Sequence, residues 1–254
     1  MPTGFIGTGA ITEHVIVGLL EHGGFSDTII ISERSQPRSA RLAMRYSNIR
    51  VEADNQAIVE QAETVFIGTL PQQTLDVLSV LSFREDQIIV SMAAMVSVEQ
   101  VTEKVHPASR VHRIIPMPPN ELGVGPIPIY PPSKEIEAIL SSIGTVVPVD
   151  HEQHFSTFSA SSAVMATFFE LVAANARWIE STGVPGDQAA QYSQAVFHSL
   201  ATQAMRLDAQ QLQEISAKCL TAGGLNEQLL HATQREGWFD ELSEELGRIL
   251  DRVQ

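Results

Sequence analysis

Two glycines near the start of the chain, Gly7 and Gly9, have the spacing of a turn that can cradle an anion. They follow a short apolar run at residues 4–6 and precede a segment with helical spacing at residues 10–22. Gly7 lets the chain turn, and Gly9 leaves the backbone open to a phosphate, which the N–H groups and dipole of the following helix attract. The pattern predicts that the pyrophosphate of a dinucleotide binds at the turn, with contacts from Ile6, Gly7, Thr8, Gly9, Ala10 and Ile11.

Two features of this turn weaken the prediction. A lone Gly-x-Gly can also be a turn with no ligand, and Thr12 stands where the dinucleotide motif usually has glycine or alanine. The position of the turn, between a first strand and a helix, favours the binding interpretation.

Charged and hydroxyl side chains follow the second apolar run. Glu33 stands where an acid often accepts the ribose 2′-hydroxyl of NAD, whereas Arg34, Ser35 and Arg38 suit the 2′-phosphate of NADP. We expect NADP, with NAD left open by Glu33. The alternative is that these residues are solvated and open a surface helix.

The elements that must position this turn alternate along the first part of the chain. Strands are predicted at residues 4–6, 28–32, 49–52, 64–70, 87–92 and 110–116, with helices at 10–22, 37–46, 55–61, 72–81 and 98–104. Continuous apolar strands are typical of a parallel sheet covered on both faces. We therefore predict a doubly wound α/β domain of Rossmann type over residues 1–149. The Pro/Gly-rich residues 116–132 are expected to run over or beyond the sheet edge, before a last helix at 136–142 and a last strand at 145–150.

The remaining residues, 150–254, have no strand-like run and predict an all-α domain. Helices are expected at 162–180, 186–207, 210–220, 225–233 and 239–253. Residues 163–179 are apolar on most sides, which predicts burial either between subunits or inside the helical domain. Cys219, Trp178 and Trp238 are expected to be packed.

Composition excludes several classes of function. The net charge is −14 and acidic residues outnumber basic ones in both halves, so nucleic acid is not expected as a partner. The longest uncharged run, residues 153–169, is rich in Ser, Thr, His and Gln and does not predict a membrane span. One cysteine and the lack of a signal-peptide pattern predict a cytoplasmic location. His151 and His154 have no further ligands nearby in sequence, so no metal site is expected.

Eight motifs taken in order resemble those of the pyrroline-5-carboxylate reductase family. They are GFIGTGAITEHVIVGLL, ISERS, DN, LPQQ, MAAMVSVEQV, RIIPMPPNELGVG, FSASSAV and LTAGG, which together cover nearly the full length. The resemblance implies that NAD(P)H also contacts Asn55, Thr69, Leu70, Pro71, Ala93 and Ala94. It further implies hydride transfer to the C=N carbon of a cyclic imine carboxylate, giving proline, and a homodimer or larger homo-oligomer formed through the helical domain.

The same resemblance places the substrate side of the site in the helical domain. It implies catalytic roles for Ser159, Ser161, Thr221 and Asn226 and substrate contacts from Ser162, Gly223, Gly224 and Leu225. A helix that begins near Ser161 is expected to offer N–H donors to an anion; the alternative for these serines is helix capping.

The substrate-side motifs depart from the family pattern. The family's P-N-T-P is Pro116-Met117-Pro118-Pro119 here, its S-G-S-G-P-A has lost both glycines and the proline, a threonine next to the substrate aligns with Leu225, and a glycine aligns with Met95. The sequence thus predicts an NADP-dependent reductase of a cyclic imine. Two alternatives stay open: a reductase of another imine or carbonyl substrate in secondary metabolism, and a dinucleotide-binding paralogue without catalysis.

Overall fold

The structure is a computed structural model that describes residues 2–34 and 36–253. The chain divides into two compact units, the first ending at Phe155 and the second beginning at Ser156. We call them the sheet unit and the helical unit. The predicted domain boundary at residue 149 lies slightly before this division.

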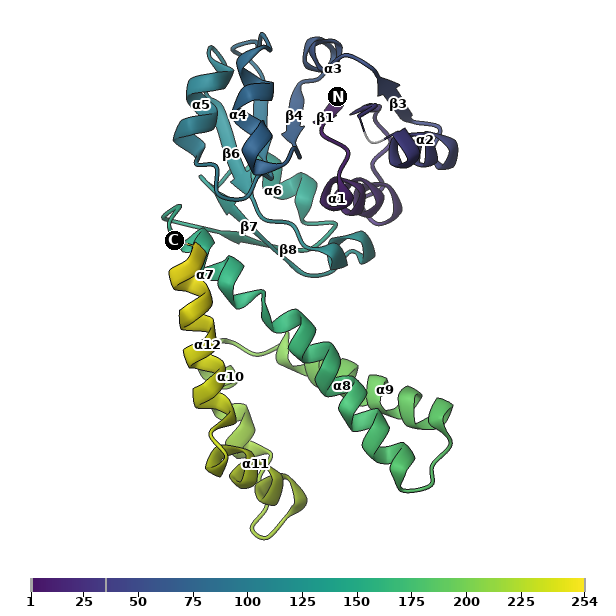
Figure 1. The fold of residues 1–254 in the computed structure, drawn as a ribbon, viewed down its shortest axis with the longest axis vertical. Helices are drawn as coiled ribbons and strands as arrows, with labels where there is room; N and C mark the ends of the chain where they lie inside the picture. The colour runs from purple at the N-terminus through teal and green to yellow at the C-terminus, as the bar shows by residue number, and fades with distance from the viewer. Residues whose placement is uncertain (1, 35, 254) are drawn as a thin grey trace. The chain divides into compact units, whose positions relative to one another are not determined.

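The sheet unit alternates strands and helices along the chain (Figure 1). The elements are β1 (Thr3–Ile6), α1 (Ala10–Glu21), β2 (Ile29–Ser32), α2 (Gln36–Arg45), β3 (Ile49–Glu52), α3 (Asn55–Gln61), β4 (Thr64–Ile67), α4 (Pro71–Ser79), β5 (Ile88–Ser91), α5 (Val98–Val105), β6 (Arg110–Ile114), the 3₁₀ helix η1 (Pro118–Leu122), β7 (Pro126–Tyr130), α6 (Lys134–Leu140) and β8 (Thr145–Pro148).

The strands form one sheet in the order β3-β2-β1-β4-β5-β6-β7-β8. Neighbouring strands are parallel except β6 and β7, which are antiparallel. The predicted doubly wound α/β fold is confirmed. The order reverses between β1 and β4, and in such sheets a ligand binds at the carboxyl ends of the strands beside this switch point.

The prediction that residues 116–132 run over or beyond the sheet edge is wrong. Residues Pro126–Tyr130 form β7, which lies inside the sheet between β6 and β8. Ile127 and Ile129 are fully buried, and Ile129 pairs with Ile114. The prolines suggested a strand break, but their apolar rings alternate with buried isoleucines, so the segment still has both faces of a buried strand.

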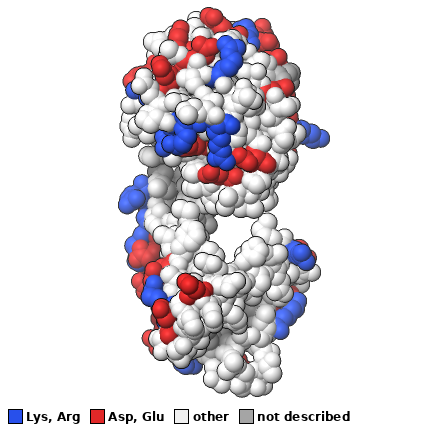
Figure 2. All heavy atoms as spheres, turned by 90° about the vertical axis from the view of Figure 1, so that its right-hand side faces the viewer, with Lys and Arg blue, Asp and Glu red and all other residues white. Residues whose placement is uncertain are grey.

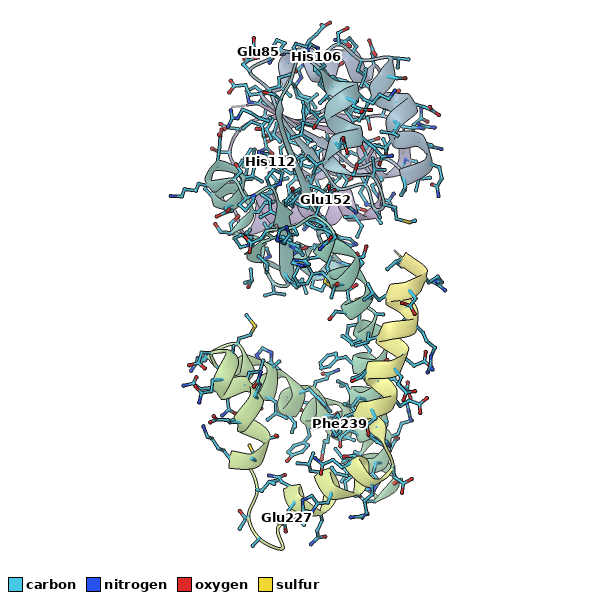
Figure 3. All side chains as sticks on the ribbon, turned by 90° about the vertical axis from the view of Figure 1, so that its left-hand side faces the viewer. Glu85, His106, His112, Glu152, Glu227 and Phe239 are labelled. Atoms are coloured by element: carbon cyan, nitrogen blue, oxygen red, sulfur yellow. The ribbon has the colours of Figure 1, made fainter. Side chains whose placement is uncertain are left out.

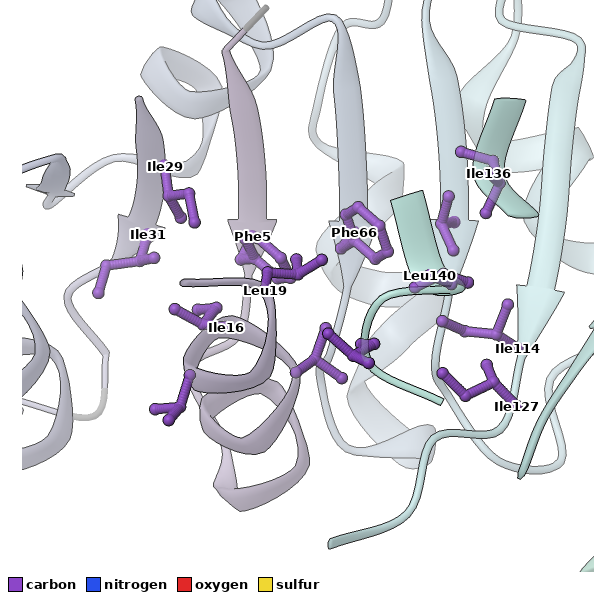
Figure 4. Close-up of a cluster of buried hydrophobic side chains, with 14 of the residues drawn as sticks. Phe5, Ile16, Leu19, Ile29, Ile31, Phe66, Ile114, Ile127, Ile136 and Leu140 are labelled. Atoms are coloured by element: carbon purple, nitrogen blue, oxygen red, sulfur yellow. The ribbon is translucent and has the colours of Figure 1, made fainter. Parts of the chain in front are cut away.

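Two apolar clusters cover the two faces of the sheet because successive strand side chains point to opposite faces. Phe5 belongs to one cluster and Ile6 to the other. Figure 4 shows the first cluster, in which the rings of Phe5 and Phe66 stack with centroids 4.7 Å apart. These two buried layers hold the carboxyl ends of β1 and β4 in fixed register, with Ile6 opposite Ile67.

The helical unit contains α8 (Val164–Ser181), α9 (Gly186–Ala204), α10 (Ala209–Lys218), α11 (Leu225–Arg235) and α12 (Trp238–Val253). The preceding helix, α7 (His154–Ser161), crosses the division between the two units. α7 was not predicted as a helix. Among the described residues of this unit only Ala160, Ala189 and Ser193 are buried. A small unit that buries so little apolar surface cannot offset its conformational entropy by itself.

The expected burial of three side chains in this unit is wrong for the single chain. Cys219 is exposed, and Trp178 and Trp238 are 66% and 57% exposed. The reason is that the single chain supplies no second layer of helices for them to pack on.

One stretch among the described residues, His154–Ser181, is long and apolar enough to cross a membrane by length and composition. It comprises two helices, α7 and α8, separated by Ser162 and Ala163. Length and composition alone are weak grounds for a span.

Candidate dinucleotide site

The glycine turn lies at the carboxyl end of β1, at the switch point of the sheet. Gly7 has φ +93°, and an added Cβ would lie 2.7 Å from the backbone carbonyl of Gly68, so no other residue fits there. The Gly7 N–H donates to Ser32 Oγ at 2.9 Å, and Thr8 Oγ1 donates to the Ser32 carbonyl at 2.7 Å. The turn is thus tied to the end of β2.

The first turn of α1 offers N–H groups to an outside acceptor. Gly9 is the N-cap residue, and no side chain caps the helix. Unpaired amides at a helix N-terminus bind anions, and the helix dipole adds to the attraction.

Glu13 in this first turn would repel an anion, but two arginines of α2 neutralise it. Arg38 Nε and Arg41 Nη2 lie 2.6 and 2.5 Å from its carboxylate oxygens. Burial raises the pKa of Glu13, but the hydrogen bonds from Arg41 and Arg38 outweigh burial, so the pKa lies below its usual value. Figure 2 shows basic and acidic side chains side by side on this unit.

Arg38 therefore does not have the free guanidinium that a 2′-phosphate ligand requires. Besides Glu13 it contacts the carbonyl of Thr8, with Nη1 at 3.4 Å. Its role in the structure is to fasten α2 to the glycine turn.

Thr12 fits at the third position of the motif because its neighbour is Gly68. Thr12 Oγ1 donates to the Gly7 carbonyl at 2.8 Å, and a Cβ on Gly68 would lie 2.1 Å from that hydroxyl. The bulk of the threonine is thus accommodated because Gly68, directly after β4, has no side chain. The hydroxyl also orients the carbonyl of the turn, an interaction that glycine or alanine cannot make.

Two hollows flank the turn at the carboxyl edge of the sheet. The first, of about 240 Å³, is lined by Gly9, Ala10, Ile11, Thr12, Gly68, Thr69, Leu70, Pro71, Met92 and Ala94. The second, of about 320 Å³, is lined by Ser32, Glu33, Arg34, Gln36, Ala53 and Asn55. We call them the β4 hollow and the β2 hollow. Most residues that the sequence assigned to the dinucleotide line one of them.

The other predicted contacts have different positions. Ile6, Thr8 and Ala93 are buried, and Ser35 lies outside the described residues. Ser32, Thr12, Gly68 and Met92 were missed by sequence reasoning. A polar residue at a strand end and a glycine after an apolar strand were the available signals, and both are common in surface turns.

Met95 has an unusual backbone near the β4 hollow. It follows Ala94 in the loop between β5 and α5, has φ +62° and is 76% exposed. Glycine adopts this left-handed conformation freely, whereas a side chain with a Cβ is strained there.

The predicted helix start near Ser161 is wrong. Ser161 ends α7, and α8 begins at Val164. The N–H groups of Ser162 and Ala163 already donate to the carbonyls of Phe158 and Ala160 at 3.0 and 3.1 Å. Both amides therefore already have backbone acceptors within α7 and are not free to bind an anion. Ser162 Oγ donates to the carbonyl of Ser159, and Ser161 is exposed.

The second predicted substrate group lies between α10 and α11, and its donors are also engaged. Gly223 N–H donates to Glu227 Oε2 at 2.6 Å, and Gly224 N–H donates to the Thr221 carbonyl at 2.7 Å. The Asn226 side-chain amide donates to the Cys219 carbonyl at 3.1 Å. Leu225 is 85% exposed at the start of α11.

Among the described residues no group of three or more His, Cys, Asp and Glu side chains could hold a metal ion. The rings of His151 and His154 contact each other edge to face, with centroids 5.5 Å apart.

The sequence of the chain is similar to those of several known proteins. Residues 2–95 match the family described as NADP oxidoreductase, coenzyme F420-dependent. The pyrroline-5-carboxylate reductase of Haemophilus influenzae is 25% identical over 66% of this chain, and that of Corynebacterium melassecola is 26% identical over 78%. The matched parts span 65% and 77% of those relatives.

Solved structures with this fold cover both units. 1-Pyrroline-5-carboxylate reductase from Streptococcus pyogenes matches with a TM-score of 0.82 at 23% identity, over 100% of this chain and 98% of that one. Pyrroline carboxylate reductase of Plasmodium falciparum with NADP bound matches with a TM-score of 0.81 at 11% identity, over 100% of this chain and 97% of that one. The chain is thus similar to pyrroline-5-carboxylate reductases in sequence and in fold.

The resemblance to these reductases gives the unusual Met95 backbone a reason. The family motif has glycine where Met95 stands, and the observed φ of +62° is a glycine conformation. The loop has therefore kept the backbone shape of the motif while its residue changed. The same holds for Thr12, which keeps the turn because Gly68 gives it room.

Proposed function

We propose that this chain is an NADPH-dependent reductase of a cyclic imine, with pyrroline-5-carboxylate as the substrate and proline as the product. The observation that carries the proposal is the uncapped N-terminus of α1 beside Gly7 and Gly9, at the switch point of the sheet. There the pyrophosphate would accept hydrogen bonds from the first-turn amides of α1.

The two hollows are proposed to hold the two ends of the dinucleotide. In the β2 hollow Arg34 has no hydrogen-bond or ion-pair partner among the residues that the structure describes, which leaves its guanidinium free for a 2′-phosphate. Glu33 lines the same hollow and suits the ribose hydroxyl of NADH, so NADH also binds in this proposal. NADPH binds more tightly, because only NADPH carries the 2′-phosphate that Arg34 would contact.

The nicotinamide would occupy the β4 hollow. Its walls include Ile11, Leu70, Pro71 and Met92, whose apolar side chains exclude water from one face of the ring. NADPH bound there supplies a hydride to the imine carbon. Because a protonated imine is already electrophilic, the residues of the chain contribute mainly orientation and desolvation.

The substrate residues of the helical unit remain predictions carried by the family resemblance. Ser159, Ser161, Thr221 and Asn226 are proposed to contact or protonate the substrate, with Ser162, Gly223, Gly224 and Leu225 beside them. The engaged amides of Gly223 and Gly224 have to exchange their present acceptors for a substrate carboxylate if they bind it. The apolar Leu225 favours a compact ring there over a long polar substrate.

We propose that a second copy of this chain covers the helical unit. Large apolar side chains are exposed along α8 and α9, among them Phe168, Phe169, Leu171, Trp178, Tyr192 and Leu200. A hollow of about 660 Å³ lies between these two helices. Contiguous apolar surface of this extent on a stable protein is normally covered, and a copy of the same unit supplies a matching apolar surface. This homodimer also accounts for the apolar composition of His154–Ser181 without a membrane, and the chain is proposed to act in the cytoplasm.

The test is NADPH oxidation with pyrroline-5-carboxylate, set beside direct titration of NADPH and NADH and a panel of cyclic imines and ketones. Saturable NADPH binding with turnover of pyrroline-5-carboxylate supports the proposal. Turnover of another imine or ketone alone would reassign the substrate, and binding without turnover would make the chain a non-catalytic paralogue. Absence of saturable binding of either coenzyme would overturn the proposal.

A further inference from the structure

The loop between β5 and α5 forms one wall of the β4 hollow and contains the strained residue Met95. Met92 and Ala94 line the hollow, and Met95 follows them with φ +62°. A side chain with a Cβ keeps this conformation only where surrounding contacts impose it. The contacts that impose it are therefore determinants of the shape of the hollow.

Both ends of this loop are hydrogen-bonded. At the β5 end Ala93 N–H donates to Ser91 Oγ at 3.3 Å. At the α5 end Ser97 and Gln100 form a reciprocal capping box. The next amide, Val98 N–H, donates to Glu152 Oε1 at 2.9 Å, and Glu152 lies 54 residues further along the chain.

Glu152 is itself held by a largely buried arginine. Arg113 Nη1 at the end of β6 donates to the same Glu152 oxygen at 3.0 Å, and the two side chains are only 12% and 23% exposed. The Arg113 guanidinium lies 4.9 Å from the ring centroid of Phe155, which is buried. Figure 3 labels Glu152 within the sheet unit. One carboxylate thus joins the segment after β8 to β6 and to the start of α5.

We propose that Glu152 is a positioning residue that holds the β5–α5 loop in its strained form and thereby sets the wall of the β4 hollow. The inference rests on the proposed function, because it takes the coenzyme as the occupant of that hollow. The carboxylate is needed for two reasons. Val98 N–H needs an acceptor at the helix start, and the largely buried Arg113 needs a negative charge beside it.

The first test is Glu152→Gln in the full chain. Glutamine keeps an oxygen that can accept from Val98 N–H, but it removes the negative charge beside Arg113. The contact that holds the start of α5 is therefore weakened. We expect the Kd for NADPH to rise about tenfold, as loss of a charged hydrogen bond implies. Amide hydrogen exchange of residues 92–98 should become faster while that of β1 and β4 does not change. Glu152→Asp, which retracts the carboxylate but keeps its charge, gives a second variant if glutamine impairs folding.

Glu135→Gln is the matched control. Glu135 pairs with Arg110, which lies on β6 as Arg113 does, and both of these side chains are about half exposed. This variant removes the same charge next to the same strand, away from the loop, and should change neither the Kd for NADPH nor the exchange of residues 92–98.

The second test is the same substitution in a Met95→Gly background. Glycine adopts positive φ without strain, so the conformation of the loop depends less on the hydrogen bond from Val98 to Glu152. We expect Glu152→Gln to weaken NADPH binding by no more than about threefold in that background, against about tenfold in the original one. Equal factors in both backgrounds would overturn the inference, as would Glu152→Gln behaving like Glu135→Gln. Amide hydrogen exchange of residues 92–98 is measured without coenzyme, so it tests the positioning role of Glu152 even if the chain binds no NADPH. Absence of NADPH binding would refute only the proposed function.

Discussion

Replacing Gly9 by alanine separates the binding role of the glycine turn from its structural role. Gly9 has φ −78° and ψ −178°, which alanine adopts freely, and the nearest atom to an added Cβ is the Gly68 oxygen at 3.8 Å. Alanine restricts the unfolded chain but is a poorer N-cap residue, and each effect is about 0.5–1 kcal/mol with opposite sign. The free energy of unfolding should therefore change by less than about 1 kcal/mol.

Coenzyme binding should respond much more strongly than stability. The added methyl stands at the start of α1, where the phosphate oxygens have to reach the first-turn amides. Loss of one charge-assisted hydrogen bond costs about 1.5–3 kcal/mol, which raises the Kd for NADPH about 10- to 150-fold. The assay is titration of NADPH by fluorescence, with thermal unfolding of the same samples.

Gly68→Ala provides the contrasting variant. Its Cβ would lie 2.1 Å from Thr12 Oγ1, and such overpacking costs about 1–3 kcal/mol of stability. Thr12→Ala in the same chain should recover part of that loss, because it removes the hydroxyl that the methyl meets. If Gly9→Ala binds NADPH as tightly as the unchanged chain, the anion does not sit at this turn, and the reasoning fails. If Gly9→Ala is as unstable as Gly68→Ala, the glycine is structural instead.

Three further outcomes follow from the same structure. Arg34→Ala should raise the Kd for NADPH about tenfold or more and that for NADH less than about twofold, because only NADPH carries the 2′-phosphate; equal losses would remove Arg34 from that role. Phe169→Glu should shift the proposed dimer to monomer in sedimentation velocity, because Phe169 is 61% exposed on α8 of the single chain; an unchanged dimer would place the interface elsewhere. Burial lowers the pKa of His112 from its ordinary value of 6.5, so the unfolded chain takes up a proton first and stability falls as the pH drops from about 6.5 towards the lowered pKa. Between about pH 7 and pH 5, thermal unfolding should show a smaller loss of stability in His112→Gln than in the unchanged chain. An identical pH profile would exclude His112 as the cause.

Local patterns in the sequence were sufficient for most of the sheet unit. Continuous apolar runs and helical spacing predicted strands and helices close to those observed, such as residues 49–52 and 55–61, which match β3 and α3. The failures are where local pattern and tertiary environment conflict. β7 contains prolines that suggested a break, yet its isoleucines are buried between β6 and β8. α7 is rich in serine and threonine, and this composition did not predict a helix.

The geometry of the glycine turn and of the helix start was predictable because both are made by consecutive residues. A turn, an open helix start and the residues at the end of β2 are each encoded within a few positions. Arg38 shows the limit of this reasoning. Its place in the sequence suited a phosphate, but Glu13 on α1 lies within hydrogen-bond distance once α1 and α2 pack together.

By itself the sequence determined most of the order of strands and helices, the glycine turn and the family resemblance, because these depend on neighbouring residues. Only the tertiary structure decided that Thr12 fits against Gly68, that Glu13 is neutralised and that Glu152 reaches the start of α5. These contacts join residues far apart in the chain. Their geometry depends on how the sheet and its helices pack, and no local pattern specifies it.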